Sequence, residues 1–354
     1  MNNIEIKTIQ QKIKLYYKKS SRALPWRVKF PENQDPYKTL ISEIMLQQTR
    51  VKTVLKYYKK FLKEFPNIKT LALASEEKVL RAWSGMGYYR RALNLHATAK
   101  IILKKYNKKI PGEKKVLITL PGIGEYTSSA IASFAFNKDE IVIDTNVERF
   151  INRIFNIKYN KIKYNHTKLL ATKVFPKKNK GNFAQAIMDF SNEYCIKLNP
   201  RCNVCLISKY CNYTKTETIK KSKTHKNKKY CTSYFIFDER KNFFVRRRPA
   251  NKILGGLYEV PSSTWVQNKI SDGQFIKLKN NSNIYYLQTS IKHEFSHFIL
   301  FSRVIILNRE NIKTFNLQGK WVNKTSLKNL PLSKLTIKIV NYSLEELSSL
   351  RKFL

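Results

Sequence analysis

The sequence has few acidic residues and few cysteines, and it contains no long apolar run. Its 354 residues include 24 Asp and Glu against 68 Lys and Arg. No stretch reaches the roughly 18 apolar residues of a membrane-spanning helix. Residues 1–14 alternate polar and apolar side chains, so they lack the apolar centre of a signal peptide. We therefore expect a soluble protein of the cell interior, without a membrane partner.

The shortage of acids leaves a formal charge of +44. An excess of this size repels itself unless a polyanion is nearby, which favours nucleic acid or an acidic membrane surface. A general enrichment in Lys, Asn and Ile, with no specific meaning, explains the same number equally well. The hydrophobic fraction of 42% is sufficient for packed cores, so a disordered chain is excluded.

Apolar spacing divides the chain into two regions. From Ile4 to Leu206 apolar residues recur at helical intervals and strand-like alternation is nearly absent. Beyond a lysine-rich stretch, residues 230–238 and 242–248 predict a β-hairpin, residues 295–307 a buried strand, and residues 336–350 a helix. We expect a helical domain over 1–213, a basic linker over 214–229 and an α+β domain over 230–354.

Four of the five cysteines lie close together, which is not the pattern of a disulfide scaffold. Six, two and five residues separate them in turn, and they are Cys195, Cys202, Cys205 and Cys211. Four thiolates at such spacing can surround one metal centre, either zinc or an iron–sulfur cluster. Zinc ribbons usually carry two Cys-x-x-Cys pairs, whereas this segment has one. Cys231 is expected to be an ordinary thiol.

Glycine is also scarce, with ten in the chain, so the pair in Leu120–Gly124 is informative. Gly122 and Gly124 allow a tight turn between helices, and the N–H groups of the following helix can bind a phosphate. The apolar run 141–143 then leads to Asp144, which is either a simple helix cap or a catalytic carboxylate. Glu43 is flanked by Ile41, Ile44 and Met45, and burial beside such groups raises a carboxyl pKa.

Together these strings resemble the MutY family of the endonuclease III, or helix-hairpin-helix, superfamily of DNA glycosylases. The resemblance rests on residues 42–49, on the hairpin, on the cysteine spacing and on residues 24–27 and 85–90. It implies a multidomain fold, an all-α helix-hairpin-helix glycosylase domain with an iron–sulfur cluster loop followed by an α+β Nudix-like domain. It also implies that the four cysteines hold a [4Fe–4S] cluster.

The resemblance also implies catalytic roles. Glu43 would protonate adenine and then activate water, Asp144 would stabilise the positive charge on the sugar, and Asn146 would orient Asp144. Tyr126 stands where endonuclease III-type enzymes have the lysine of a Schiff base, which implies a monofunctional glycosylase. Thr145 and Glu125 depart from the MutY pattern and put the detailed geometry in question.

Further positions match the DNA-contacting residues of the family. Gln48 and Tyr88 would enter the base stack, and Gln185 would bind the flipped adenine. Phe295, Ser296 and His297 would sense 8-oxoguanine in the opposite strand. Residues 253–261 resemble a segment of the Nudix-like domain, but no glutamate-rich metal-binding helix follows, so we expect no pyrophosphatase activity.

The predicted function is hydrolysis of adenine mispaired with 8-oxoguanine or guanine, during base excision repair. The partner would be double-stranded DNA carrying that mispair, and the protein a monomer of the bacterial cytosol and nucleoid. One alternative is an endonuclease III-type glycosylase and lyase acting on oxidised pyrimidines. Another is a non-catalytic DNA-binding metalloprotein, for which Glu43 and Asp144 would have to be incidental.

Overall fold

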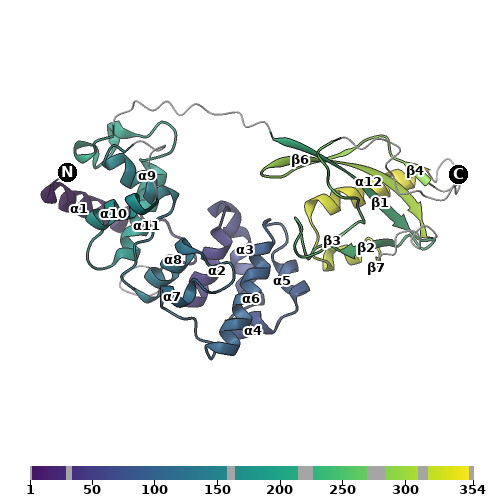
Figure 1. Cartoon of the computed structure of the whole chain (residues 1–354), viewed down its shortest axis with the longest axis horizontal. Coiled ribbons are helices and arrows are strands. Elements are labelled where there is room, and N and C mark those ends of the chain that lie inside the picture. Colours follow the sequence, from purple (N-terminus) through teal and green to yellow (C-terminus); the bar gives the residue numbers. More distant parts are fainter. Residues whose placement is uncertain are drawn as a thin grey trace. The chain divides into compact units, whose positions relative to one another are not determined.

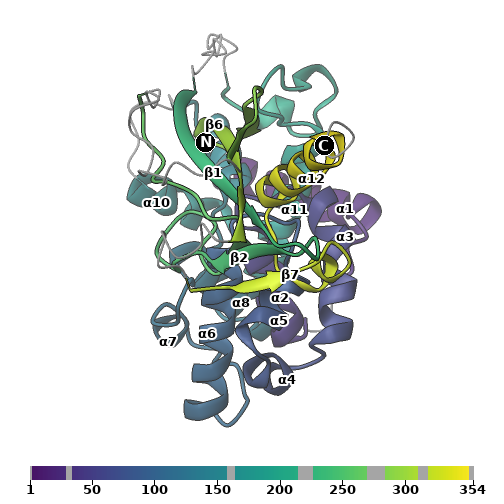
Figure 2. The ribbon, with the colours of Figure 1, turned by 90° about the vertical axis from the view of Figure 1, so that its right-hand side faces the viewer.

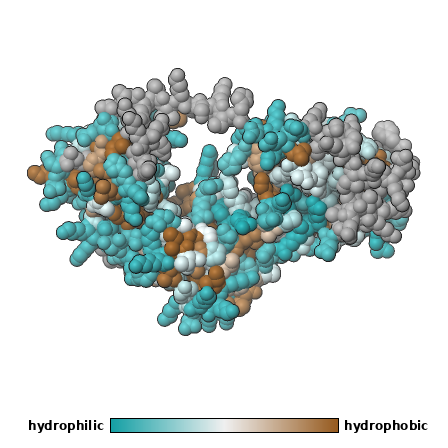
Figure 3. Space-filling view, in the orientation of Figure 1, coloured by the Kyte–Doolittle hydropathy of each residue, from teal (hydrophilic) through white to brown (hydrophobic). Residues whose placement is uncertain are grey.

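A computed structural model describes residues 2–28, 34–157, 164–213, 226–268, 284–309 and 318–350 (Figure 1). The backbone divides into two compact units, Met1–Leu73 with Asn94–Lys221, and Ala74–Leu93 with Ser222–Leu354. Within the described ranges, no helix combines the length and the apolar character needed to cross a membrane. On the surface visible in Figure 3, hydrophilic side chains predominate among the described residues of both units.

The first unit is helical, as its apolar spacing predicts, and its described residues contain no strand. The helix α6 (Arg90–Lys105) begins in the second unit and continues into this one. The other elements are α1 (Asn3–Ser20), α2 (Pro36–Leu46), α3 (Val51–Glu64), α4 (Ile68–Leu73), α7 (Lys114–Leu117), α8 (Glu125–Phe136), α9 (Thr145–Ile154), α10 (Tyr164–Val174), α11 (Lys180–Glu193), η2 (Cys202–Val204) and η3 (Ser208–Tyr210).

A core of aliphatic and aromatic side chains fixes α1, α9 and α11 together. Phe150 of α9 and Phe190 of α11 are fully buried, and their rings meet edge to face with centroids 6.0 Å apart. The extended run Ile141–Ile143 is buried in the same core. Because this run leads directly into α9, the core determines where Asp144 stands. Elsewhere in the unit α2 packs against α8, which brings Glu43 and Tyr126 to neighbouring helices.

The second unit combines a mixed sheet with two helices. In its described residues the strand order is β3-β2-β1-β6-β4, with β5 paired to β6 and β7 paired to β2. The pairs are antiparallel except β1 with β6, which run parallel from Asn227↔Phe298 to Phe237↔Asn308. The elements are α5 (Glu76–Ala82), β1 (Asn227–Phe237), β2 (Phe243–Arg247), β3 (Tyr258–Glu259), β4 (Ile284–Tyr286), β5 (Ile291–Glu294), β6 (Phe298–Asn308), β7 (Lys320–Val322), η6 (Ser326–Asn329) and α12 (Lys334–Leu350).

Alternating side chains on the strands build apolar clusters on both faces of this sheet. Phe235 of β1 belongs to the cluster that also contains side chains of α12, whereas Tyr234 and Ile236 belong to the opposite one. Figure 2 shows the ribbon of α12 beside the strands of this sheet. The predicted hairpin is confirmed, since β1 and β2 pair at Phe237↔Phe243. The predicted strand over 295–307 is confirmed with a later start, because the N–H of Phe295 donates to the carbonyl of Phe298 and closes a turn.

Residues 74–93 belong to the second unit and make polar contacts with its β2 and β3. Arg247 Nη2 lies 2.6 Å from Glu76 Oε1, and the Tyr258 hydroxyl donates to Glu77 over 3.1 Å. Exposed ion pairs of this kind contribute little individually, about 0–1 kcal/mol. Apolar spacing along the chain carries no information on these contacts.

Candidate active site

Glu43 occupies the buried side of α2. The helix begins at Asp35, whose carboxylate accepts the N–H groups of Tyr37 and Lys38, and Pro36 supplies its first residue. From Thr39 to Met45 every side chain is buried, so Glu43 is only 5% exposed. A carboxylate in such surroundings loses hydration, and its proton becomes harder to remove.

The surroundings of Glu43 raise its pKa from 4.5 to about 7. Burial is the main cause, and the negative charge of Asp144 adds to it, whereas the Tyr126 hydroxyl and the charge of Arg27 lower the pKa. Glu43 Oε2 is buried and has no hydrogen-bond partner among the described residues. Near neutral pH this carboxyl can therefore either donate or accept a proton, and one of its oxygens is available to a ligand.

Tyr126 lies in the first turn of α8 and bonds to Glu43. Burial raises the pKa of Tyr126 well above its usual value, and the negative charges of Glu43 and Asp144 raise it further. The phenol therefore stays protonated, and its O–H donates a hydrogen bond to the Glu43 carboxylate. It has no amine with which to form a Schiff base.

Asp144 is both the N-cap of α9 and a residue of the cleft. Its Oδ1 accepts the N–H groups of Asn146 at 2.9 Å and of Val147 at 2.7 Å. Its Oδ2 accepts the side-chain amide of Asn146 at 2.6 Å. Burial raises the pKa of Asp144, while these hydrogen bonds and the charge of Arg149 oppose the shift. Capping thus holds the carboxylate in one orientation, so a capping role and a catalytic role are compatible.

The two carboxylates line one cleft of about 900 Å³ in the first unit. The same cleft contains most of the residues singled out from the sequence for this unit, namely Tyr126, Asn146, Gln48 and Gln185, together with Thr145. A group of pKa about 7 beside a second, firmly held carboxylate is suited to proton transfer and to stabilising positive charge. Bond cleavage that leaves a cationic sugar needs both functions.

Sequence reasoning missed the arginines of this cleft. Asp189 of α11 is fully buried and receives Arg22 Nε at 2.5 Å and Arg27 Nη1 at 2.7 Å. These ion pairs hold residues 22–27 along the rim, where Arg27 is close enough to lower the pKa of Glu43. Arg27 ends the Leu24–Arg27 string, so the signal was present, but its partner lies 162 residues away.

Gln185 lies one helical turn before Asp189 and is 2% exposed. The Tyr17 hydroxyl donates to Gln185 Oε1 over 3.4 Å. With its oxygen engaged in this way, Gln185 has its amide N–H groups to offer to an acceptor in the cleft. A ring nitrogen of a purine is such an acceptor.

The tight turn at residues 120–124 and the helix that follows it contact the segment 42–49 through Gln47. Gln47 Nε2 donates to the carbonyl of Gly122 and to Thr127 Oγ1, both over 3.1 Å. Gly122 has φ of +77°, and a Cβ there would lie 2.7 Å from Asn94 Cβ. Both the backbone conformation and the lack of space therefore require glycine. Gly124 is the N-cap of α8 and provides no capping side chain. Gln48 adopts a left-handed backbone with φ of 53° at the edge of the cleft.

The acid at position 125 is neutralised by neighbouring lysines. Glu125 pairs with Lys114 of α7, and Lys168 of α10 lies 3.8 Å away. The hydrogen bond from Lys114 is the main reason that the pKa of Glu125 is lowered, so the carboxylate stays charged. Lys114 also lies 3.5 Å from Glu140, so two lysines and two carboxylates balance their charges beside residues 120–124, and Glu125 presents no unpaired negative charge to a bound phosphate.

The four clustered cysteines line a single cavity in the loop that follows α11. In the described part of the chain, no three cysteine, histidine or acidic side chains are grouped closely enough for one metal ion. Four thiolates are a donor set that holds either zinc or an iron–sulfur cluster, so the chemistry of these side chains fits a metal centre of that kind.

Two arginines of α9 bind this loop. Arg153 Nη1 lies 3.4 Å from Cys195 Sγ and 2.7 Å from the carbonyl of Ile196. Arg149 Nε donates to the carbonyl of Cys195 over 2.7 Å, and its Nη2 donates to Asn146 Oδ1 over 2.9 Å. A continuous chain of hydrogen bonds therefore leads from the cysteine loop to Asp144.

The loop 295–297 lies in the second unit, between β5 and β6. Ser296 and His297 are exposed, whereas Phe295 is half-buried. The Ser296 hydroxyl lies 2.6 Å from the hydroxyl of Tyr88. Tyr88 has φ of 48° and its side chain is 41% exposed, so an aromatic ring projects from a constrained backbone. The unit thus brings together two residues for which the sequence predicts contacts with DNA.

Comparison with family models divides the chain in the same way. Residues 41–177 match the model described as HhH-GPD superfamily base excision DNA repair protein. Residues 232–342 match the NUDIX domain. The expected fold, a helix-hairpin-helix glycosylase domain and a Nudix-like domain, is confirmed.

Curated relatives match nearly the whole length. An adenine DNA glycosylase of Buchnera aphidicola subsp. Baizongia pistaciae is 36% identical over 343 residues, which cover 93% of this chain and 95% of the relative. An adenine DNA glycosylase of Schizosaccharomyces pombe is 28% identical, with coverage of 97% and 90%.

Solved structures agree with the helical fold. A thermostable thymine-DNA glycosylase has a TM-score of 0.55 and 30% identity, covering 60% of this chain and 97% of its own. A non-covalent endonuclease III–DNA complex has a TM-score of 0.52 at 20% identity, covering 60% and 96%, and this likeness concerns the fold alone. From its motifs, its two domains and its relatives, the chain belongs to the adenine DNA glycosylase (MutY) family of base excision repair enzymes.

Proposed function

We propose that this DNA glycosylase hydrolyses the N-glycosidic bond of adenine placed opposite 8-oxoguanine or guanine in double-stranded DNA. The observation that carries the proposal is the pair Glu43 and Asp144 in one cleft, with the pKa of Glu43 raised to about 7. The adenine substrate rests on the relatives named above, and the preference for 8-oxoguanine rests on the loop 295–297.

Glu43 acts first as the acid. Protonated Glu43 gives its proton to a ring nitrogen of adenine as the bond between that base and C1′ of the sugar breaks. The bonding electron pair leaves with the base, which departs neutral. Tyr126 steadies the carboxylate that remains. Water then adds to C1′ and returns a proton to Glu43, which restores the starting state.

Asp144 supports the cationic sugar. Positive charge develops on C1′ and the ring oxygen as the base leaves, and a carboxylate held in a buried site stabilises it strongly. The bonds from Asn146 and Val147 keep Asp144 oriented before the substrate arrives. Asp144 either remains an ion partner or bonds transiently to C1′, and water then displaces it.

DNA recognition is divided among several elements. Gln185 would bind the extruded adenine, Gln48 and Tyr88 would fill or wedge the base stack, and the backbone at Gly122 and Gly124 would bind a phosphate. Ser296 and His297 would contact the oxidised guanine, with Phe295 behind them.

Cys195, Cys202, Cys205 and Cys211 would hold a [4Fe–4S] cluster. Iron–thiolate bonds from these four cysteines would hold residues 195–211 together. The protein should accordingly be brown, with broad absorption near ~400 nm. A colourless protein containing one stoichiometric zinc ion would contradict this part of the proposal.

We propose a catalytic domain over 1–213, a basic linker over 214–229, whose residues from Asn227 on already belong to β1, and a second domain over 230–354. We expect a monomer that acts on DNA in the bacterial cytosol. Residues 214–225 of the linker lie outside the described residues.

Alkali-induced strand cleavage on three duplexes tests the proposal. Adenine opposite 8-oxoguanine should be excised fastest, adenine opposite guanine more slowly, and thymine glycol not at all. Strand nicking without alkali on the thymine glycol duplex would support the endonuclease III-type alternative. Binding without excision of any base would support the non-catalytic alternative.

A further inference from the structure

The indole ring of Trp265 packs against the two aromatic residues at the ends of the turn that carries Ser296 and His297. The ring centroid of Trp265 lies 5.5 Å from that of Phe295 and 6.0 Å from that of Phe298. Phe295 and Phe298 stack on each other at 4.6 Å with planes 19° apart. The three rings form one cluster, and the exposed residues Ser296 and His297 connect two of its members.

A guanidinium group covers another part of the same indole. Arg248 Cζ lies 4.4 Å from the centroid of Trp265, within the range of a cation–π contact. Arg248 is itself fixed, since its Nη1 pairs with Glu259 and its Nε donates to the carbonyl of Ile253 over 2.6 Å. Glu259 belongs to residues 253–261, the segment that resembles a Nudix-like domain.

The backbone of the loop is fixed at Phe295. Its N–H donates to the carbonyl of Phe298 over 2.9 Å, and its carbonyl accepts Lys226 Nζ at 2.9 Å. These bonds define the turn, but they leave the Phe295 ring to be held by packing alone. Trp265 is the ring that joins Phe295 to Arg248.

We propose that Arg248 and Trp265 are positioning residues that hold the loop 295–297 in the conformation that reads the base opposite adenine. A series of contacts fixes the exposed loop relative to β3, since Glu259 of β3 pairs with Arg248, Arg248 covers Trp265, and Trp265 packs on Phe295. This inference rests on the proposed function, because it takes the loop as the reader of 8-oxoguanine. It gives residues 253–261 a role that does not involve hydrolase chemistry.

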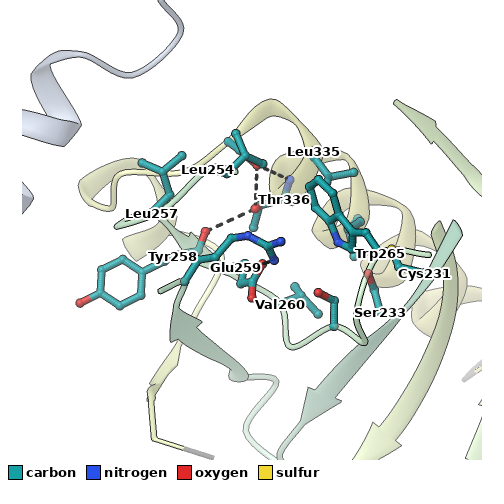
Figure 4. Close-up of a pocket in the computed structure, with 14 residues that line it drawn as sticks. Cys231, Ser233, Leu254, Leu257, Tyr258, Glu259, Val260, Trp265, Leu335 and Thr336 are labelled. Atoms are coloured by element: carbon teal, nitrogen blue, oxygen red, sulfur yellow. Dashed lines mark hydrogen bonds and ion pairs between the residues drawn. The ribbon is translucent and has the colours of Figure 1, made fainter. Parts of the chain in front are cut away.

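The indole acts through its ring and not through its N–H group. Trp265 borders a cavity shared with Cys231 and Leu335, shown in Figure 4, and its Nε1 is buried without a hydrogen-bond partner among the described residues. A buried donor without a partner costs free energy. Removing that N–H while retaining an aromatic ring should therefore preserve the support.

The test compares Trp265→Leu with Trp265→Phe in the full-length protein. The readout is the ratio of single-turnover excision rates for adenine opposite 8-oxoguanine and opposite guanine, at one salt concentration. Loss of the aromatic and cation–π contacts should reduce this ratio roughly three- to tenfold in Trp265→Leu. Trp265→Phe should keep most of it.

The second unit offers a matched control. Trp321 packs on Phe244 and lies under Arg309, 5.4 Å from ring centroid to Cζ, in the apolar cluster on the other face of the sheet. Trp321→Leu should lower stability yet leave the ratio unchanged, because both rates fall with the folded fraction. An equal loss of ratio in Trp321→Leu and Trp265→Leu would overturn the proposal.

Arginine variants keep the proposal testable if Trp265→Leu does not fold. Arg248→Met should lower the ratio, whereas Arg246→Met should not, although Arg246 also pairs with Glu259 at 3.0 Å.

The double variant Ser296→Ala, His297→Ala distinguishes the positioning role of Trp265 and Arg248 from the base-reading role of the loop 295–297. If this double variant loses the ratio while Trp265→Leu and Arg248→Met keep it, the positioning role is wrong and the reading loop stands. If the double variant keeps the ratio, the loop assignment itself is wrong.

Discussion

The catalytic cleft and the loop 295–297 present their polar residues in opposite ways. Glu43 is almost fully buried, and burial raises its pKa to about 7. Ser296 and His297 are exposed on a turn that a ring cluster supports. Proton transfer at neutral pH needs a carboxyl removed from water, whereas reading a base in the opposite strand needs donors that reach outward. The first region uses burial to change the acidity of a carboxyl group, and the second uses packing to hold exposed side chains in place.

The largest expected effect concerns the acid of the cleft. Glu43→Gln keeps the shape of the side chain but cannot protonate adenine, so excision should fall roughly 10²–10⁴-fold or more. Both mispairs should be affected equally, and DNA binding should persist. Single-turnover rates with a parallel binding measurement check this. Excision within tenfold of the unmodified protein would remove Glu43 from the role of acid.

The next effect concerns the reading loop. Ser296→Ala with His297→Ala removes polar contacts to one base, which costs on the order of 1–3 kcal/mol. Excision opposite 8-oxoguanine should slow by about tenfold, while excision opposite guanine should change little. If both rates fall by the same factor, the loop does not read the base.

The buried acid should also have a cost in stability that depends on pH. The folded-state pKa of Glu43 is raised, so its contribution favours folding most below about pH 4.5 and is lost as the pH rises towards 7. Glu43→Gln should therefore stabilise the protein at pH 8 by up to about 3 kcal/mol, and much less at pH 5. Thermal unfolding at the two pH values measures this difference. A variant that is equally or less stable at pH 8 would argue against a buried, titrating Glu43.

The smallest effect concerns Tyr126. Its hydroxyl lowers the pKa of Glu43, so Tyr126→Phe should raise that pKa. An acid catalyst loses its proton as the pH rises through its pKa, so the excision rate falls there. In Tyr126→Phe this fall should occur at a pH that is higher by less than about one unit. A pH series of single-turnover rates shows the shift. A downward movement would mean that Tyr126 does not bond to the carboxylate.

Local patterns in the sequence predicted the elements of both units. Helical spacing predicts the first unit, alternation predicts β1, β2 and β6, and the position of Asp144 between an apolar run and a helical pattern predicts a helix cap. These features depend on neighbours a few residues apart, and they are therefore visible in a single chain.

Long-range partners could not be predicted in this way. Asp189 binds Arg27 across 162 residues, and Ser296 meets Tyr88 across 208. The parallel pairing of β1 with β6 and the position of Trp265 beneath Phe295 likewise depend on tertiary packing. Motif resemblance indicated Glu43, Asp144 and Asn146, whereas the contacts of Asp189 with Arg27 and of Trp265 with Phe295 follow from the three-dimensional structure alone.

The division of labour between the two regions is tested most directly by one pair of variants on one pair of substrates. Asn146→Ala removes the amide that orients Asp144, and Ser296→Ala with His297→Ala alters the loop. Single-turnover rates on adenine opposite 8-oxoguanine and opposite guanine should fall by the same factor in Asn146→Ala, so their ratio stays constant. In the loop variant the ratio should fall while the rate opposite guanine is retained. A constant ratio in the loop variant, or a changed ratio in Asn146→Ala, would contradict the account.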